Sequence, residues 1–274
     1  MSDVSTLPGF SEGHIPVVGG RIHYVVGGQG DQTVLLLHKL GGWTSEWRWV
    51  MPILATRMRV MAVDLTGHGS STMNGEAPFI ATQEELASHL MATLNEVDEH
   101  TVSIVGSSIG GCVGAVCASL WPERIRALIT VGSALGGSVP HSSLKSDAAK
   151  AIADGLFDSN EVPLPRPHSF MENIFGMRDP AHMEEMTLSR QAAGRWIQPC
   201  ARGVALYDYL SILPRIDAPV LMAYGTNGNY GRFAEPAIAL MKNGQSEAIQ
   251  DASAFPHQDK PEDTATSIMS FLGV

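Results

Sequence analysis

Five short and nearly unbroken apolar runs recur along the chain, at residues 33–38, 60–63, 102–105, 127–131 and 220–224. Runs of this kind are typical of central parallel strands, because such strands are buried on both faces of a sheet. Two further runs, 15–18 and 21–26, are separated by Gly19 and Gly20 and predict an antiparallel hairpin. The pattern therefore predicts a sheet that begins with a hairpin and continues with parallel strands.

Between these runs, apolar residues recur at helical spacing. One predicted helix has an apolar face formed by Leu86, Leu90, Leu94 and Val97. Thr82 and Glu85 precede this face with the spacing of a capping box, which marks the start of a helix. A second, shorter face is formed by Trp47, Met51 and Leu54. Alternation of strands and helices predicts an α/β fold with a doubly wound, mostly parallel sheet.

The alternation stops between about residues 134 and 214, where no strand-like run occurs. Helical spacing returns at residues 143–156 and 180–193. Between these two segments, three prolines within residues 161–168 exclude a regular helix. We expect a mostly helical insertion that lies over one edge of the sheet.

Composition and charge narrow the class of protein. The chain has 274 residues, 44% of them hydrophobic and 17% charged, which excludes a disordered, collagenous or coiled-coil protein. No apolar run approaches the roughly 18–20 residues of a membrane span. The net charge of −10 argues against nucleic acid and anionic membranes as partners. The expected partner is a small-molecule substrate, and the oligomeric state is left open.

The N-terminus and the cysteines bear on the location of the protein. The first ten residues have neither a basic start nor an apolar stretch, so no signal peptide is expected. The cysteines are odd in number and lack metal-ligand spacing: Cys112, Cys117 and Cys200. We expect them to be reduced core thiols of a cytoplasmic protein, and we predict no metal site.

A glycine-rich segment, residues 106–111 (GSSIGG), follows the predicted strand 102–105 and opens a helical run to Leu120. A serine on a strand-to-helix turn needs small neighbours, because the turn is tight and the backbone passes close by. Such a turn exposes the hydroxyl of Ser108 and directs the N-terminus of the next helix toward it. The alternative is a glycine-rich contact between helix and sheet, since the 28 glycines of the chain make a chance match easy.

Three further motifs occur in a fixed order around this serine: residues 38–42 (HKLGG), 64–71 (DLTGHGSS) and 121–125 (WPERI). With them, the chain resembles the α/β-hydrolase superfamily over nearly its whole length. The resemblance implies an α/β-hydrolase core formed by residues 1–135 and 214–274. It also implies that residues 136–213 are the helical cap that commonly shapes the substrate pocket.

The resemblance also implies roles for particular residues. Ser108 is the expected nucleophile, and the backbone N–H groups of Leu40 and Ile109 are the expected oxyanion donors. The implied reaction is hydrolysis of a small ester, lactone or activated C–C bond through an acyl-Ser108 intermediate, without a cofactor.

The third member of the catalytic triad is missing from its usual places. The family's acid lies three residues past the glycine that ends the seventh strand, and here that position holds Gly228. Residues 131–134, after the preceding strand, contain no acid either. Asn227 or Asn229 can orient an imidazole by accepting its N–H, or each is an ordinary turn residue.

The catalytic histidine is displaced as well. When the C-terminal segment is aligned with the family without a gap, the histidine position falls on Ala254, and His257 matches a second, usually non-catalytic histidine. A local shift of the loop by three residues would bring His257 over Ser108. We therefore predict His257 as the general base.

Lys39 stands where most members of the family have glycine, in the turn that binds the oxyanion. Three interpretations compete for it. Its amine extends to solvent along the core; or it binds a substrate carboxylate or the oxyanion; or it is the base of a Ser–Lys dyad. In either functional case, a cation near Ser108 favours an anionic substrate.

The two departures at Gly228 and Ala254 leave a second class of function open. The protein can be a ligand-binding pseudoenzyme or a cofactor-free lyase that uses the pocket for proton transfer, since the fold does not decide between these.

Overall fold

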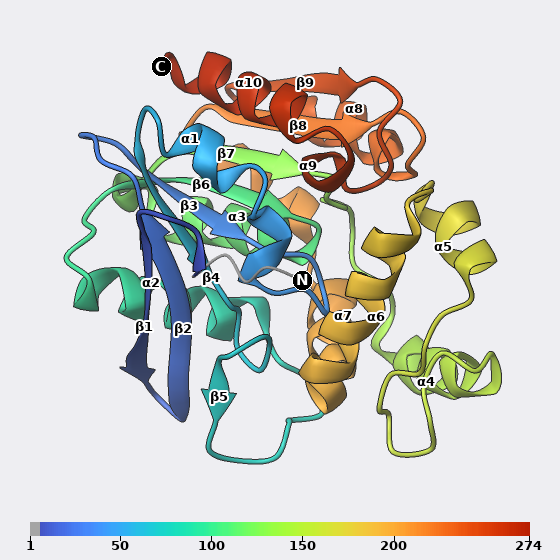
Figure 1. Ribbon diagram of the computed structural model, residues 1–274. Coiled ribbons are helices and arrows are strands. Elements are labelled where there is room, and N and C mark those ends of the chain that lie inside the picture. Colours follow the sequence, from blue (N-terminus) through green and yellow to red (C-terminus); the bar gives the residue numbers. More distant parts are fainter. Residues whose placement is uncertain (1–5) are drawn as a thin grey trace.

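Nine strands form one sheet in the computed structural model, which describes residues 6–274 apart from the side chains of residues 148, 149, 152 and 153 (Figure 1). The strand order is β1-β2-β4-β3-β6-β7-β8-β9, and β5 pairs with β2. The strands are β1 (Phe10–Val17), β2 (Gly20–Gly27), β3 (Thr33–Leu37), β4 (Arg59–Val63), β5 (Thr72–Met73), β6 (Val102–Ser107), β7 (Ile125–Val131), β8 (Val220–Gly225) and β9 (Gly244–Ile249).

The five apolar runs of the sequence are β4, β3, β6, β7 and β8, which lie side by side and parallel. All residues of β3 and β6 are buried, as expected for strands covered on both faces. β1 and β2 form the predicted antiparallel hairpin. The mostly parallel α/β sheet is thus confirmed, and its two central strands end at the two predicted oxyanion segments.

The edge strand β9 is not predicted by the sequence pattern. Its residues, GQSEAI, are largely polar and only its last residue is buried. An edge strand has one neighbour and a solvated face, so it needs no apolar run. It pairs in parallel with β8 and closes the far edge of the sheet.

Helices cover both faces of the sheet (Figure 1). One face packs against α2 (Gln83–Glu96), α3 (Ile109–Leu120) and α8 (Ala234–Ile238). The other packs against α1 (Met51–Leu54) and α10 (Pro261–Leu272), and the short α9 (Pro256–Asp259) precedes α10. α2 begins as predicted, because the side chain of Thr82 accepts a hydrogen bond from the backbone N–H of Glu85.

The segment between β7 and β8 is helical. It contains α4 (Leu144–Ala153), α5 (His168–Phe175), α6 (Pro180–Ala193) and α7 (Ile197–Leu206), which gather on one side of the molecule (Figure 1). In its described part the only strand-like pairing is an isolated bridge between Phe157 and Pro163. The division of the chain at residues 136 and 213 stays a prediction.

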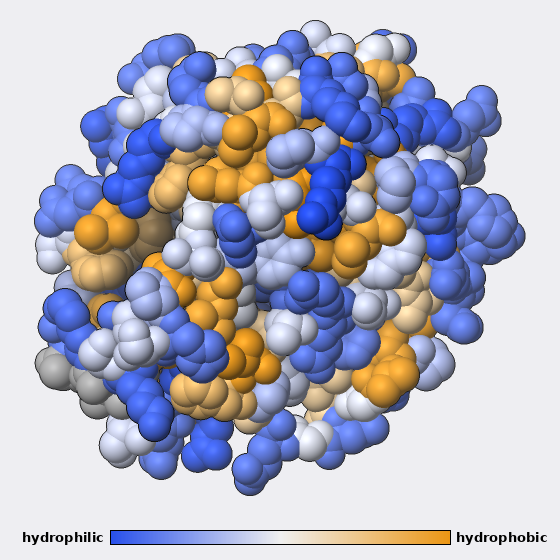
Figure 2. All heavy atoms as spheres, turned by 180° about the vertical axis from the view of Figure 1, so that it is seen from behind, coloured by the Kyte–Doolittle hydropathy of each residue, from blue (hydrophilic) through white to orange (hydrophobic). Residues whose placement is uncertain are grey.

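The surface is mixed in character. Seen from behind, hydrophobic atoms form separate patches within a largely hydrophilic face (Figure 2). None of the described helices combines the length and the apolar character that a bilayer crossing needs.

The three cysteines, Cys112, Cys117 and Cys200, are free thiols inside the core. Burial raises the pKa of each thiol to about 12. The expectation of buried thiols is thus confirmed.

Candidate active site

Ser108 lies on a strained turn between β6 and α3. Its φ of 51° and ψ of −113° are unfavourable for a residue that carries a Cβ. The turn also requires glycine at two neighbouring positions. A Cβ on Gly106 would lie 2.2 Å from the carbonyl carbon of Gly110, and one on Gly110 would lie 2.4 Å from the carbonyl oxygen of Leu37. A plain helix–sheet contact would not need the strained serine, so the geometry matches the predicted nucleophile turn.

The predicted oxyanion donors lie on either side of this turn. Lys39 and Gly42 close a tight turn, in which the Gly42 N–H donates to the Lys39 carbonyl at 2.8 Å and Gly41 has a φ of +73°. Leu40 occupies the second position of this turn, so the turn's own hydrogen bond does not use its N–H. Ile109 is the first residue of α3, and its N–H has no acceptor within the helix. Their role as oxyanion donors stays a prediction.

The hydroxyl of Ser108 has an unexpected partner. Its Oγ lies 3.3 Å from Oη of Tyr230, which begins a 3₁₀ helix (Tyr230–Phe233) after β8. Burial raises the pKa of Tyr230, although the hydrogen bond to Ser108 and the charge of Arg166 oppose the rise. The phenol is therefore neutral at physiological pH. Sequence reasoning missed Tyr230, although it lies two residues past Gly228, in the loop where an acid was sought.

The two empty triad positions are neighbours in space. A Cβ on Gly228 would lie 2.6 Å from the backbone N and Cα of Ala254, as expected for an acid and a histidine that should meet. Ala254 is fully buried beside Phe255 and Tyr230. A Cβ on Gly132 would lie 2.1 Å from the Ala254 carbonyl oxygen and 3.2 Å from Cδ2 of Tyr230. The ring of Tyr230 thus lies beside Ala254, the position that aligns with the family's histidine.

His257 is fully buried and turned toward Glu46. Its Nε2 lies 3.1 Å from Oε1 of Glu46, and its ring stacks on Trp47 with centroids 4.3 Å apart. Burial lowers the pKa of His257, although Glu46 opposes this, so the ring is neutral and donates its Nε2–H. No hydrogen bond described for this chain joins His257 to Ser108. Its role as general base stays a prediction that this geometry does not support.

Lys39 is buried and paired. Its Nζ lies 2.7 Å from Oε2 of Glu46, and only 3% of its side chain is exposed. The interpretation that its amine reaches solvent is therefore wrong. The Nζ of Lys39 is thus held by Glu46, and no described hydrogen bond joins it to Ser108. Lys39 instead stabilises the turn that it begins, and its role as base stays an unsupported prediction.

Glu46 is the centre of this buried group. It also accepts the backbone N–H of Lys39 at 2.9 Å, so one carboxylate binds both the main chain and the side chain of that residue. Burial would raise the pKa of Glu46, but the charge of Lys39 and the hydrogen bond from His257 outweigh it and hold the pKa well below its usual range. Glu46 could have been found from the sequence, because a lysine that points inward needs a carboxylate nearby and Glu46 lies seven residues away.

Two arginines of the helical segment converge beside the site. Arg190, on α6, is 4% exposed, and its Nε and Nη2 are buried with no described hydrogen-bond partner. A Cβ on Gly41 would lie 2.6 Å from Cγ of Arg190, so this side chain covers the oxyanion turn. Burial and the neighbouring charge of Arg166 lower the pKa of Arg190 to about 9.

Arg166 links this cation to Tyr230. Burial lowers the pKa of Arg166 to about 10, while the nearby phenol of Tyr230 acts in the opposite direction. Its Nε is likewise buried with no described partner. Sequence reasoning missed both arginines, because nothing in their local pattern distinguishes them from other arginines of the segment.

The two candidate orienting residues have no described contact with an imidazole. Asn227 is exposed, and its backbone N–H donates to the Ala252 carbonyl oxygen. Asn229 has a buried Oδ1 with no described partner. Their orienting role stays a prediction.

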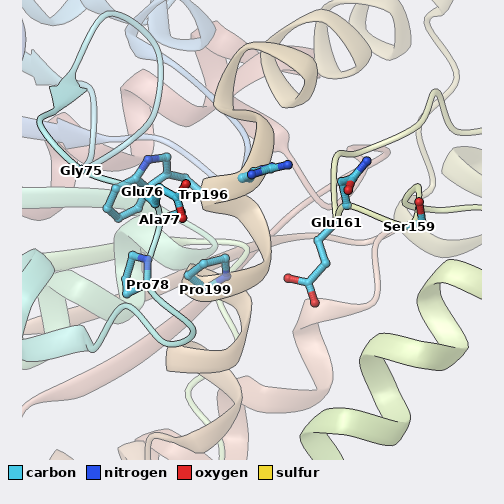
Figure 3. A pocket seen from close by; sticks show the side chains of 10 residues that line it. Gly75, Glu76, Ala77, Pro78, Ser159, Glu161, Trp196 and Pro199 are labelled. Carbon is cyan, nitrogen blue, oxygen red and sulfur yellow. The ribbon is translucent and has the colours of Figure 1, made fainter.

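A separate open cleft of about 610 Å³ lies between the loop after β5 and the helical segment. Glu76 and Trp196 line one side, and Ser159 and Glu161 lie across from them (Figure 3). Trp196 packs on Gly67, where a Cβ would lie 2.1 Å from its ring. This cleft does not include Ser108 among its lining residues. Within the described part of the chain, no group of three or more His, Cys, Asp or Glu residues is arranged to hold a metal ion.

Comparison with known proteins identifies the family. A family model described as "Alpha/beta hydrolase family" matches residues 34–267 of this chain. The chain therefore belongs to the alpha/beta hydrolase family, as the resemblance of its motifs predicted.

Two curated relatives and one solved structure illustrate the range of this family. The dihydrolipoyllysine-residue acetyltransferase component of the acetoin cleaving system of Pseudomonas putida is 34% identical over 142 residues, which are 51% of this chain and 38% of that protein. The chain thus spans well under half of that relative. A 2-hydroxy-6-oxononadienedioate/2-hydroxy-6-oxononatrienedioate hydrolase from Cupriavidus pinatubonensis is 28% identical over 221 residues, covering 77% of this chain and 75% of the relative.

Among solved structures, the enol-lactonase from Burkholderia xenovorans LB400 superposes with a TM-score of 0.73 at 19% identity. The superposition covers 96% of this chain and 100% of that one, and it shows a shared fold. The matching family and the dioate hydrolase are both described as hydrolases, whereas the enol-lactonase shares the fold.

Proposed function

We propose that the protein is a serine hydrolase that cleaves a small anionic ester, lactone or activated C–C compound through an acyl-Ser108 intermediate. The hydroxyl of Ser108 attacks the carbonyl carbon, and the N–H groups of Leu40 and Ile109 stabilise the oxyanion. The strained φ of Ser108 supports this role, since strain of this kind persists where function requires an exposed nucleophile. The reaction needs no cofactor.

The observation that carries the anionic substrate is the pair Arg166 and Arg190. A buried cation without a hydrogen-bonding anion is costly, and here two guanidinium groups raise that cost for each other. A carboxylate accepts two parallel N–H bonds from one guanidinium, so a carboxylate-bearing ligand removes both the unpaired donors and the repulsion. Because Arg190 covers Gly41 of the oxyanion turn, the bound carboxylate lies close to the reacting carbonyl.

The dioate hydrolase points in the same direction. Its name describes substrates that carry two carboxylates. A substrate of this class can place one carboxylate against the arginines and leave the bond to be cleaved near Ser108.

Two chromogenic esters of matched acyl length test this proposal: 4-nitrophenyl hemisuccinate, which carries a terminal carboxylate, and 4-nitrophenyl butyrate, which does not. We expect kcat/KM to favour the hemisuccinate by about 10- to 100-fold, the effect of one charge-assisted hydrogen-bonded pair. Arg190→Met should remove this preference and leave butyrate turnover largely unchanged. Ser108→Ala should abolish turnover of both esters.

Arg195→Met is the matched control, because Arg195 is an exposed arginine five residues away that lines the other cleft. It should keep the preference of the wild type. A hemisuccinate preference that survives Arg190→Met and Arg166→Met together would contradict the carboxylate site, whereas esterase activity that survives Ser108→Ala would contradict the nucleophile.

A cofactor-free lyase or a ligand-binding protein is the second candidate. The observation that favours it is the pair Gly228 and Ala254, which leaves the acid and histidine positions without functional side chains. A protein of this kind would bind glutarate or succinate through the arginines, measurable by calorimetry, and would turn over neither ester.

A further inference from the structure

Tyr230 lies next to the position of the missing imidazole and next to the nucleophile. Gly228 and Ala254, at the acid and histidine positions, lie in contact, and Gly132 lies against the Ala254 carbonyl. The ring of Tyr230 lies beside Gly132 and packs in the same apolar cluster as Ala254. The Oη of Tyr230 is also the described hydrogen-bond partner of Ser108 Oγ, at 3.3 Å. The other candidates, His257 and Lys39, are both held by Glu46.

We propose that Tyr230 is the residue that exchanges a proton with Ser108, in place of the triad histidine. This inference rests on the proposed function, because it assumes that Ser108 attacks a carbonyl carbon. A phenol differs from an imidazole in one respect that shapes the mechanism. It carries one proton and lone pairs on a single oxygen, so it can accept a proton and release another without changing its net charge.

The proton transfers balance in both half-reactions. As Oγ bonds to the carbonyl carbon, its proton moves to Oη of Tyr230, and the phenolic proton moves to the leaving oxygen as its bond to the acyl carbon breaks. The alcohol departs, and the acyl group remains on Ser108. Water then attacks the acyl carbon, gives one proton to Oη, and the phenolic proton returns to Oγ as the acid is released.

The charged groups around Tyr230 suit such a relay. Cys112 of α3, Arg166 of the helical segment and Arg232 of the same 3₁₀ helix are the groups whose charges act on it. The two arginines oppose the effect of burial, so they stabilise the partial negative charge that develops on Oη during transfer. The pKa of Arg166 is lowered to about 10 and that of Cys112 is raised to about 12, so neither group titrates between pH 5 and 8.

The rate at which a fluorophosphonate ester labels Ser108 tests the proposal without knowledge of the natural substrate. Here Oγ bonds to phosphorus and fluoride leaves with the relayed proton, and intact mass spectrometry follows the adduct. We expect a labelling rate that is flat from pH 5 to 8 in the wild type. Tyr230→Phe should lower it about 100-fold or more, the usual worth of a positioned proton-transfer group.

Tyr230→His provides a second readout, which a merely structural role would not produce. An imidazole at this position should restore labelling at pH 8 and make it fall below about pH 6.5. Tyr224→Phe is the matched control, because Tyr224 lies on β8, packs on Gly231 and has no described hydrogen bond to Ser108. It should label like the wild type.

The outcomes separate the two proposals. Labelling in the wild type that is lost in Ser108→Ala supports the nucleophile. If Tyr230→Phe then labels at the wild-type rate while His257→Gln is slow, the relay is wrong and His257 is the base. If the wild type itself gains no mass, the covalent mechanism fails and the relay fails with it.

Discussion

At the scale of single residues, Lys39 shows what a buried charge requires. Its ammonium and its backbone N–H both bind Glu46, and His257 occupies one of the same carboxylate oxygens. A pair this deeply buried gains little over an apolar pair of the same size, because both charges lose their hydration. Removing one partner is different, since the remaining charge stays buried without compensation.

We therefore expect Lys39→Met to destabilise the protein by about 3–5 kcal/mol, because Glu46 keeps its charge at a site that is 0% exposed. The double variant Lys39→Met and Glu46→Gln should recover much of that loss. Urea denaturation of the two variants and the wild type measures the difference. A double variant that is less stable than Lys39→Met would contradict this, because Glu46 would then stabilise the fold through His257 and the Lys39 main chain.

At the scale of elements, the turn at Ser108 stores strain between β6 and α3. A residue with a Cβ at φ 51° and ψ −113° costs about 1–3 kcal/mol. Ser108→Gly relieves this strain but makes the unfolded chain more flexible, which offsets part of the gain. We expect a net gain of about 1 kcal/mol in the free energy of unfolding, with complete loss of activity.

Ser108→Ala is the control for this prediction, because alanine keeps the Cβ and hence the strain. Thermal denaturation should place its Tm close to that of the wild type and below that of Ser108→Gly. Equal Tm values for glycine and alanine would mean that the turn is not strained.

The elements also show how far the sequence could lead. The central strands were predictable because burial on both faces leaves an unbroken apolar run, and the serine turn because close backbone approach requires glycine at Gly106 and Gly110. β9 was not predictable, because an edge strand exposes alternate side chains. Tyr230 and Ser108 are 122 residues apart, and only the folded sheet brings their hydroxyls together. A partner such as Tyr230 therefore cannot be recognised from the sequence around it.

At the scale of the whole molecule, buried histidines make stability depend on pH. Burial and the charge of His38 lower the pKa of His68 from the ordinary 6.5 to about 3. Between these two pH values, His68 is protonated in the unfolded chain but neutral in the folded protein. The free energy of unfolding therefore falls as the pH drops from 6.5 toward 3. The expected slope is roughly 1.4 kcal/mol per pH unit from this histidine.

The pH dependence of the free energy of unfolding tests whether His68 is the residue responsible. Urea denaturation at pH 4.5, 5.5 and 6.5 should show a weaker pH dependence for His68→Gln than for the wild type. His23 contributes with the opposite sign: burial lowers its pKa, but Asp64 and Glu12 outweigh this and raise it, so its contribution is present below pH 6.5 and is lost as the pH rises through the raised value. If His68→Gln and the wild type lose stability equally as the pH falls, the acid sensitivity comes from other groups, such as His257.

The burial of all three thiols has a practical consequence. Because Cys112, Cys117 and Cys200 are enclosed in the core and their pKa values are raised to about 12, alkylating reagents reach them only when the fold opens. A cysteine introduced at Val18, which is 88% exposed at the tip of the β1–β2 hairpin, would then be the sole fast-reacting thiol of the native protein. One protein can thus carry a fluorescent label at a single site, and the slow alkylation of its own cysteines then measures the rate at which the core opens.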